Sequence, residues 1–155
     1  MNRFMITRAL DAPVDRVWEI IGNPGASPGR GVDVHVDRPG AADGSGLIRT
    51  VRVGRTTAHE EITAVGPGRV IRYRLIKGAP VRDYASDVAL HESPDGGTAV
   101  SWEARFRPLV PGTGWALRLL SIRTLNRVLD AVAESSSARA GRGEASGRML
   151  PPPIG

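Results

Sequence analysis

The sequence predicts an α+β fold in which a curved antiparallel β-sheet wraps around a long C-terminal α-helix. The middle of the chain is a series of short strand-like segments separated by hairpin-length turns, and strands in such a series pair antiparallel. Only two segments have helical periodicity, a short one near the N-terminus and a long one towards the C-terminus. One helix of this length buries its apolar stripe on one face of the sheet.

The N-terminal part predicts a strand followed by a short helix. Residues 3–10 form the first strand candidate. Asp11 and Pro13 favour a helix start, because aspartate caps the first turn and proline fits into it. The predicted helix covers 13–21, where apolar residues recur at helical spacing, and the Gly- and Pro-rich segment 22–31 is a predicted loop.

Six further strand candidates follow this loop, each bounded by turn-forming residues. Val, Ile and Thr are frequent in them, and Gly, Pro and Asp mark the turns between them. The predicted strands are 32–37, 46–53, 56–65, 69–76, 82–92 and 97–107.

The last predicted element is an amphipathic helix over 113–134. Its apolar stripe consists of Trp115, Leu119, Ile122, Leu125, Leu129 and Val132. Beyond it the chain becomes small, polar and rich in Gly and Pro. We therefore expect one domain over residues 1–137 and a disordered basic tail over residues 138–155.

The charge of the chain is less informative about partners than its total suggests. The 155 residues hold 21 Lys+Arg and 16 Asp+Glu, a net charge of +5. Three of the basic residues and one acidic residue lie in 138–155. Residues 1–137 therefore hold 18 basic and 15 acidic residues, a net charge of +3. This balance, without basic clusters interleaved with aromatics, predicts that the protein does not bind nucleic acid.

Several kinds of chemistry have no support in the sequence. The absence of cysteine excludes disulfides and thiolate metal sites. His35, His59 and His91 fall on different predicted strands without metal-ligand spacing, so we expect no metal. No glycine-rich nucleotide loop is present, and we expect no cofactor. Without a signal peptide or an apolar run of membrane-spanning length, we expect a cytoplasmic protein with no membrane insertion, either a monomer or a homodimer.

Strand alternation predicts which side chains line an apolar space between sheet and helix. Arg49 falls among inward apolar neighbours, and Glu60 shares the inward face with Ile62 if that face of 56–65 is the buried one. The alternative face would turn His59 and Glu61 inward. The candidate ligand-binding residues are Arg49, Val51, Glu60, Tyr73, Tyr84, Ser86, Trp102 and Phe106.

Arg49 and Glu60 are the most informative of these candidates. A buried arginine and a buried carboxylate are unfavourable unless they pair, and adjacent strands would let these two do so. The pair could hold a ligand carboxylate, enol or phenolate. A purely structural ion pair is the alternative, and for Trp102 and Phe106 a role as core residues that pack on the helix is favoured over a role as a stacking platform.

An ordered set of short motifs resembles a known superfamily. Residues 12–18 match an A-P-x-x-x-V-W opening helix, 46–49 match a G-x-x-R strand, and 97–102 precede the long helix in the same order. The chain is thus similar to the START/birch-pollen-allergen-like (SRPBCC) superfamily and, within it, to the polyketide cyclase/dehydrase family. The resemblance implies a helix-grip fold with a ligand cavity, and similar plant hormone receptors use polar groups near the positions of Glu60, Tyr84 and Ser86. Members of the family often carry an aromatic residue in the loop corresponding to 22–31, which has none here, and we expect the cavity mouth to be either open or mobile.

The resemblance does not imply one reaction, because members include cyclases, aromatases, lipid carriers and receptors. The leading hypothesis is a protein that binds a small hydrophobic ligand, either lipid-like, polyketide or aromatic. The alternative is a polyketide cyclase/dehydratase in which the candidate catalytic residues Arg49, Glu60 and Tyr84 assist proton transfer during ring closure.

Overall fold

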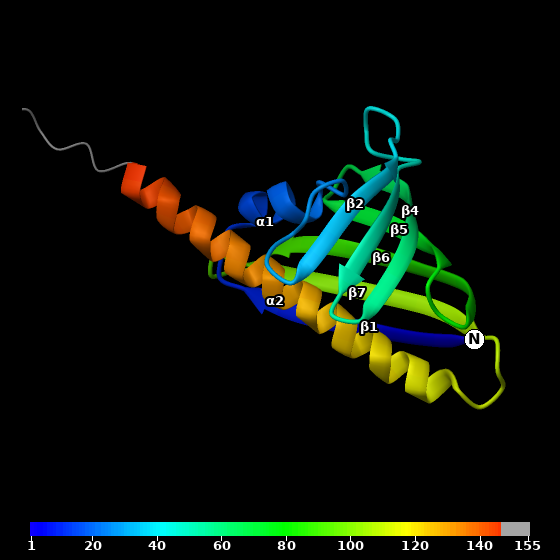
Figure 1. Ribbon diagram of the computed structural model, residues 1–155. Coiled ribbons are helices and arrows are strands. Elements are labelled where there is room, and N and C mark those ends of the chain that lie inside the picture. The colour runs from blue at the N-terminus through cyan, green and yellow to red at the C-terminus, as the bar shows by residue number, and fades with distance from the viewer. Residues whose placement is uncertain (147–155) are drawn as a thin grey trace, which may run out of the picture.

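The computed structural model describes residues 1–146 and confirms the α+β arrangement (Figure 1). Seven strands and two helices follow one another in the predicted order. They are β1 (Asn2–Leu10), α1 (Val14–Ile21), β2 (Val32–Arg38), β3 (Ile48–Val53), β4 (Thr56–Gly66), β5 (Val70–Lys77), β6 (Val81–Glu92), β7 (Thr98–Pro108) and α2 (Gly114–Ser146). Within the described residues, no helix is both long enough and apolar enough to cross a membrane.

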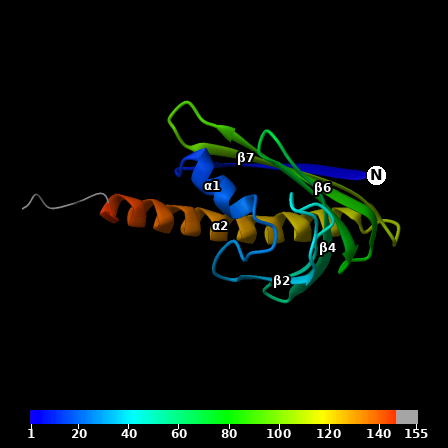
Figure 2. The same cartoon turned by 90° about the horizontal axis from the view of Figure 1, so that it is seen from above.

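All seven strands form one antiparallel sheet in the order β1-β7-β6-β5-β4-β3-β2. Strands β2 to β7 are joined by successive hairpins, whereas β1 crosses to pair with β7 along its whole length. The sheet curves around α2, and α1 lies beside α2 at the opposite end from the chain's N-terminus (Figures 1 and 2). This curvature creates the space in which the candidate site lies.

The strand alternation expected from the sequence holds for the core. In β7, Val100, Trp102, Ala104 and Phe106 are buried on the face toward α2. From the helix side, Leu125, Leu129 and Val132 close the core, together with Val17 and Ile20 of α1. The inward face of β4 carries Glu60 and Ile62, which resolves the choice left open by its sequence.

The structure differs from the sequence expectations at both ends of α2. Residues 138–146, expected to be disordered, continue the helix. This segment contains three alanines, two arginines and a glutamate, whose helix propensity outweighs that of its two glycines. Residues 147–155, the rest of the expected tail, lie outside the described part. At the other end, Trp115 and Leu119 of the expected buried stripe are exposed, whereas Gly114 is buried and Leu117 packs against the core. The first turns of the helix therefore turn another face toward the sheet than the expected stripe.

Candidate ligand-binding site

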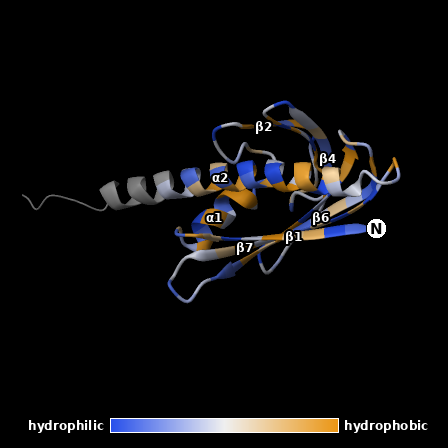
Figure 3. Ribbon diagram, turned by 90° about the horizontal axis from the view of Figure 1, so that it is seen from below, coloured by the Kyte–Doolittle hydropathy of each residue, from blue (hydrophilic) through white to orange (hydrophobic). Residues whose placement is uncertain are grey.

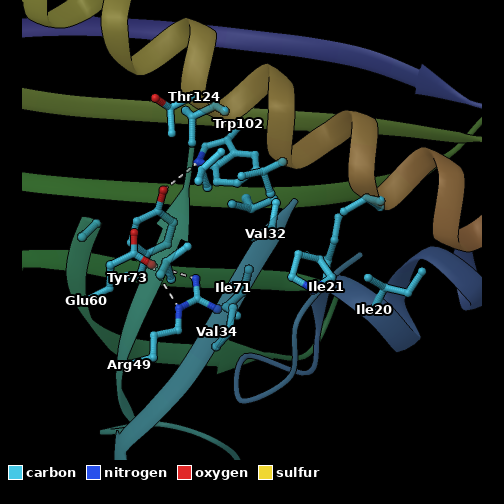
Figure 4. A pocket seen from close by; sticks show the side chains of 18 of the residues that line it. Ile20, Ile21, Val32, Val34, Arg49, Glu60, Ile71, Tyr73, Trp102 and Thr124 are labelled. Carbon is cyan, nitrogen blue, oxygen red and sulfur yellow. Dashed lines mark hydrogen bonds and ion pairs between the residues drawn. The ribbon is translucent and has the colours of Figure 1, made fainter. Parts of the chain in front are cut away.

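An apolar cavity of about 100 Å³ lies between α2, α1 and the concave face of the sheet. Strands β2, β3, β4 and β5 form its floor, and Figure 4 shows side chains from both helices pointing into it. Five of the predicted ligand-binding residues line it. They are Arg49, Val51, Glu60, Tyr73 and Trp102.

The two charged side chains of the cavity wall pair with each other. Arg49 on β3 lies opposite Glu60 on β4 in the strand register. Its Nε donates to Glu60 Oε1 at 3.0 Å, and its Nη2 lies 2.9 Å from the same oxygen. The side chains are only 16% and 11% exposed, so the pair is largely withdrawn from water. The ion pair expected from strand alternation is therefore present.

Arg49 also connects the sheet to the loop between α1 and β2. Its Nη1 donates to the carbonyl oxygen of Pro24 at 3.0 Å, and its guanidinium lies 5.8 Å from the ring centroid of Tyr73. A cation at this distance from an aromatic ring is attracted to it. One arginine thus orients a carboxylate, a ring and the loop that borders the cavity.

The loop over 22–31 packs closely against α2 at Gly29. A Cβ atom at Gly29 would lie 2.6 Å from the carbonyl oxygen of Ala131, so only glycine permits this approach. Asn23, Ala26 and Pro28 of the same loop line the cavity. The absence of side-chain bulk lets the loop approach the helix.

Burial changes the acid–base properties of the site. It raises the pKa of Glu60 above its ordinary value, while the charge of Arg49 acts in the opposite direction. Burial also raises the pKa of Tyr73 well above that of a free tyrosine, so its hydroxyl remains protonated. The indole Nε1 of Trp102 donates to this hydroxyl at 3.2 Å, which fixes the two rings at a right angle.

The other three predicted residues lie on the same face of the sheet but outside the cavity. Phe106 is 1% exposed, stacks on Tyr84 with centroids 5.9 Å apart and meets Phe4 edge to face. Ser86 is fully buried, and its Oγ has no hydrogen bond of ordinary geometry. Leu117 and Ile122 of α2 pack against this end of the core. Alternation identifies the inward face, but it does not tell which part of that face the helix fills.

Sequence reasoning also missed much of the cavity wall. Ile20 and Ile21 come from the end of α1, and Thr124, Leu125 and Val128 come from α2. Their apolar periodicity was visible in the sequence, where it indicated burial without distinguishing a packed position from a cavity wall. That distinction depends on how far α1 and α2 stand from the sheet.

A second polar group lies on the outer face of the sheet. The Thr50 hydroxyl donates to Asp37 Oδ2 at 2.6 Å and lies 3.0 Å from His59 Nδ1, and His35 Nδ1 lies 3.0 Å from Asp37 Oδ1. The hydrogen bond from Thr50 is the main reason that the pKa of Asp37 is lowered. Residues 1–146 contain no group of three or more His, Asp or Glu side chains arranged to hold a metal ion.

A curved antiparallel sheet that grips one long helix, with an apolar cavity between them, defines a helix-grip domain. Residues 1–141 match the family described as polyketide cyclase / dehydrase and lipid transport, and the chain belongs to this family. The resemblance of the sequence to the polyketide cyclase/dehydrase family is thereby confirmed. No curated protein sequence matches the chain significantly.

Solved structures show the same fold at low sequence identity. A START superfamily protein from Mycobacterium smegmatis matches with a TM-score of 0.71 and 11% identity, over 88% of this chain and 97% of that chain. A Thermobifida fusca protein matches with a TM-score of 0.71 and 20% identity, over 89% and 95% of the two chains. Norcoclaurine synthase from Thalictrum flavum, in complex with dopamine and hydroxybenzaldehyde, matches with a TM-score of 0.66 and 14% identity, over 86% and 84%.

Proposed function

We propose that the protein binds a small hydrophobic molecule, with the apolar body in the cavity and one neutral polar group at Arg49 and Glu60. The observation that carries this proposal is a largely buried ion pair in the wall of a mostly apolar cavity. Ligand sites commonly combine apolar walls with a few fixed polar groups. Lipid-like, polyketide and aromatic molecules share this chemistry.

The hydrogen bonds of the pair favour a hydroxyl or a carbonyl over a carboxylate. Arg49 uses three of its five N–H groups on Glu60 and Pro24, which leaves donors for a ligand oxygen. Both contacts to Glu60 fall on Oε1, so Oε2 remains an acceptor for a ligand hydroxyl. A ligand carboxylate would bring a second negative charge beside Glu60, which is unfavourable in a desolvated site.

The volume of the cavity favours a small ligand. About 100 Å³ accommodates roughly one aromatic ring, since engineered cavities of comparable size bind benzene. A longer molecule requires the loop over 22–31 to move away from α2. The fold is compatible with ligands of one aromatic ring, because the norcoclaurine synthase structure contains two single-ring aromatics that bear hydroxyl groups.

Phenol, which has one ring and one hydroxyl, is therefore the appropriate probe. We expect phenol to shift the indole N–H resonance of Trp102 in a two-dimensional NMR titration, and benzoate to bind more weakly. Val51→Phe places a ring inside the cavity and should weaken phenol binding at least about tenfold, or roughly 1.4 kcal/mol. Arg52→Leu, on the opposite face of β3, is the matched control and should bind as wild type does. Equal phenol binding by wild type and Val51→Phe would exclude this cavity as the site.

A cyclase or dehydratase is the second candidate function, favoured by the raised pKa of Glu60 in the cavity. A carboxyl with a raised pKa can hold and return a proton near neutral pH. Glu60→Gln preserves the shape of the side chain but removes that ability. If the protein cyclises poly-β-ketone thioesters, Glu60→Gln should lower kcat at least about a hundredfold with little change in KM. Equal kcat values for the two proteins would exclude Glu60 as the proton carrier.

A further inference from the structure

The outer surface of the first turns of α2 is apolar. Trp115 is 72% exposed, and Leu119 and Leu120 are also exposed, whereas Leu125 and Leu129 further along the helix are buried. Hydrophobic residues therefore surround the helix at its N-terminal end, as the orange end of α2 in Figure 3 shows. The solvent-facing side of a surface helix normally carries polar residues. Packing in the core therefore does not explain why these apolar side chains are on the surface.

The adjoining loop extends the apolar surface. Leu109 and Val110 are both about half exposed, and they stand between β7 and α2. The amide of Leu109 donates to the carbonyl oxygen of Pro80 at 2.9 Å, and the Thr113 hydroxyl donates to the carbonyl oxygen of Val110 at 2.7 Å. These bonds hold the loop in a defined position. We refer to Leu109, Val110, Trp115, Leu119 and Leu120 as the apolar end.

Unpaired arginines accompany the apolar end. Residues 104–129 contain no Asp or Glu and five arginines, namely Arg105, Arg107, Arg118, Arg123 and Arg127. None of these five forms an ion pair with another described residue. Arg107 lies opposite Arg82 in the register of β6 and β7. Asp83, Asp87 and Glu103 are the acids on these strands toward this end, and Asp87 lies opposite Glu103. Asp87 is 3.5 Å from Arg72, and Glu103 is 3.3 Å from Arg3.

We propose that the apolar end docks on the surface of an anionic lipid bilayer. Tryptophan and leucine enter the boundary between head groups and acyl chains, while arginines contact lipid phosphates. Arg118 and Arg123 lie within the same turns of α2 as the exposed leucines, so both contacts are available to one surface. The contact is peripheral, and it is independent of the ligand proposed for the cavity.

The combination of apolar and cationic side chains selects this partner over two others. A second copy of the chain would bring its own Arg118 and Arg123 against these, and like charges at an interface oppose association. A nucleic acid would neutralise the arginines but leave the leucines in water. An anionic bilayer satisfies both kinds of side chain, because it places an apolar layer directly beneath negative head groups.

Sedimentation of the full chain with vesicles tests the proposal. We expect binding to equimolar phosphatidylcholine and phosphatidylglycerol, at least about tenfold weaker binding to phosphatidylcholine alone, and loss of affinity as salt is raised. Trp115→Gln, and separately Leu119→Gln with Leu120→Gln, should each weaken binding at least about tenfold. Arg118→Glu with Arg123→Glu should do the same. Arg30→Glu with Arg52→Glu is the control, since it changes the charge equally at exposed positions elsewhere.

Three outcomes would overturn the proposal. They are equal binding to both kinds of vesicle, no binding to either, and equal losses in the control and in Arg118→Glu with Arg123→Glu. A wild-type dimer that Trp115→Gln dissociates in sedimentation equilibrium would instead assign the surface to a second copy. Val51→Phe, which fills the cavity, should bind vesicles as wild type does. This variant separates a failure of membrane docking from a failure of ligand binding.

Discussion

Replacing Arg49 by methionine is expected to lower the free energy of unfolding by about 3 kcal/mol. The substitution leaves the Glu60 carboxylate in an apolar wall without its counter-charge, and it removes the donor to Pro24. Urea denaturation at neutral pH measures the loss. Arg49→Met with Glu60→Leu should come within about 1 kcal/mol of wild type, because an apolar pair replaces a buried ion pair with little net change. Equal losses in the single and double variants would mean that the charge pairing is not what stabilises this wall.

The same variant should change the pH dependence of stability. The pKa of folded Glu60 lies above its ordinary value near 4.5, so between the two values the folded state binds more protons than the unfolded state. Stability from this group is therefore complete below the ordinary pKa and declines as the pH rises through the folded pKa. Without Arg49 the folded pKa rises further, and the decline should extend to higher pH. A profile parallel to that of wild type would contradict this assignment.

Replacing Phe106 by alanine is expected to lower the free energy of unfolding by about 4 kcal/mol. Phe106 is almost completely buried and contacts the rings of Phe4 and Tyr84, so the change leaves a void that these rings cannot fill. Such a loss is a large part of the stability of a typical domain. Urea denaturation measures it, with Met5→Ala at an exposed position of β1 as the control.

Substitutions at Phe106 and Trp102 distinguish the packed core from the ligand site. Phe106→Leu, which keeps more of the packing, should leave phenol binding unchanged because the residue lies outside the cavity. Trp102→Leu should weaken phenol binding, because the indole lines the cavity and positions the Tyr73 hydroxyl. Isothermal titration calorimetry compares these variants, since Trp102→Leu removes the indole resonance. The reverse pattern of effects would place the site at the Phe106 end of the core.

Local signals in the sequence account for most of the sheet and for the central pair of the site. Alternation along β3 and β4 turned Arg49 and Glu60 to the same face, and the short Gly54–Arg55 connection between the strands fixed them opposite each other. Burial then required that they pair. Both steps use neighbouring strands, for which the sequence carries direct information about register.

Features that depend on distance between layers could not be predicted in this way. Tyr84, Ser86 and Phe106 have the same inward orientation as Trp102, yet α2 packs over them and leaves the space at Trp102 open. The exposure of Trp115 likewise depends on which face of the first turns of α2 meets the sheet, and Leu117 is the residue that packs there. Periodicity describes one helix face and contains no information about how far the partner sheet extends.

Native mass spectrometry of the full chain, purified from its own host alongside Val51→Phe, tests the central claim most directly. The account predicts that wild type retains one noncovalently bound small molecule, with an apolar body and a hydroxyl or carbonyl group, and releases it on collisional activation. Val51→Phe, folded but with the cavity filled, should carry none. Wild-type protein without a bound molecule, or the same molecule on both proteins, would contradict the assignment of this cavity as the ligand site.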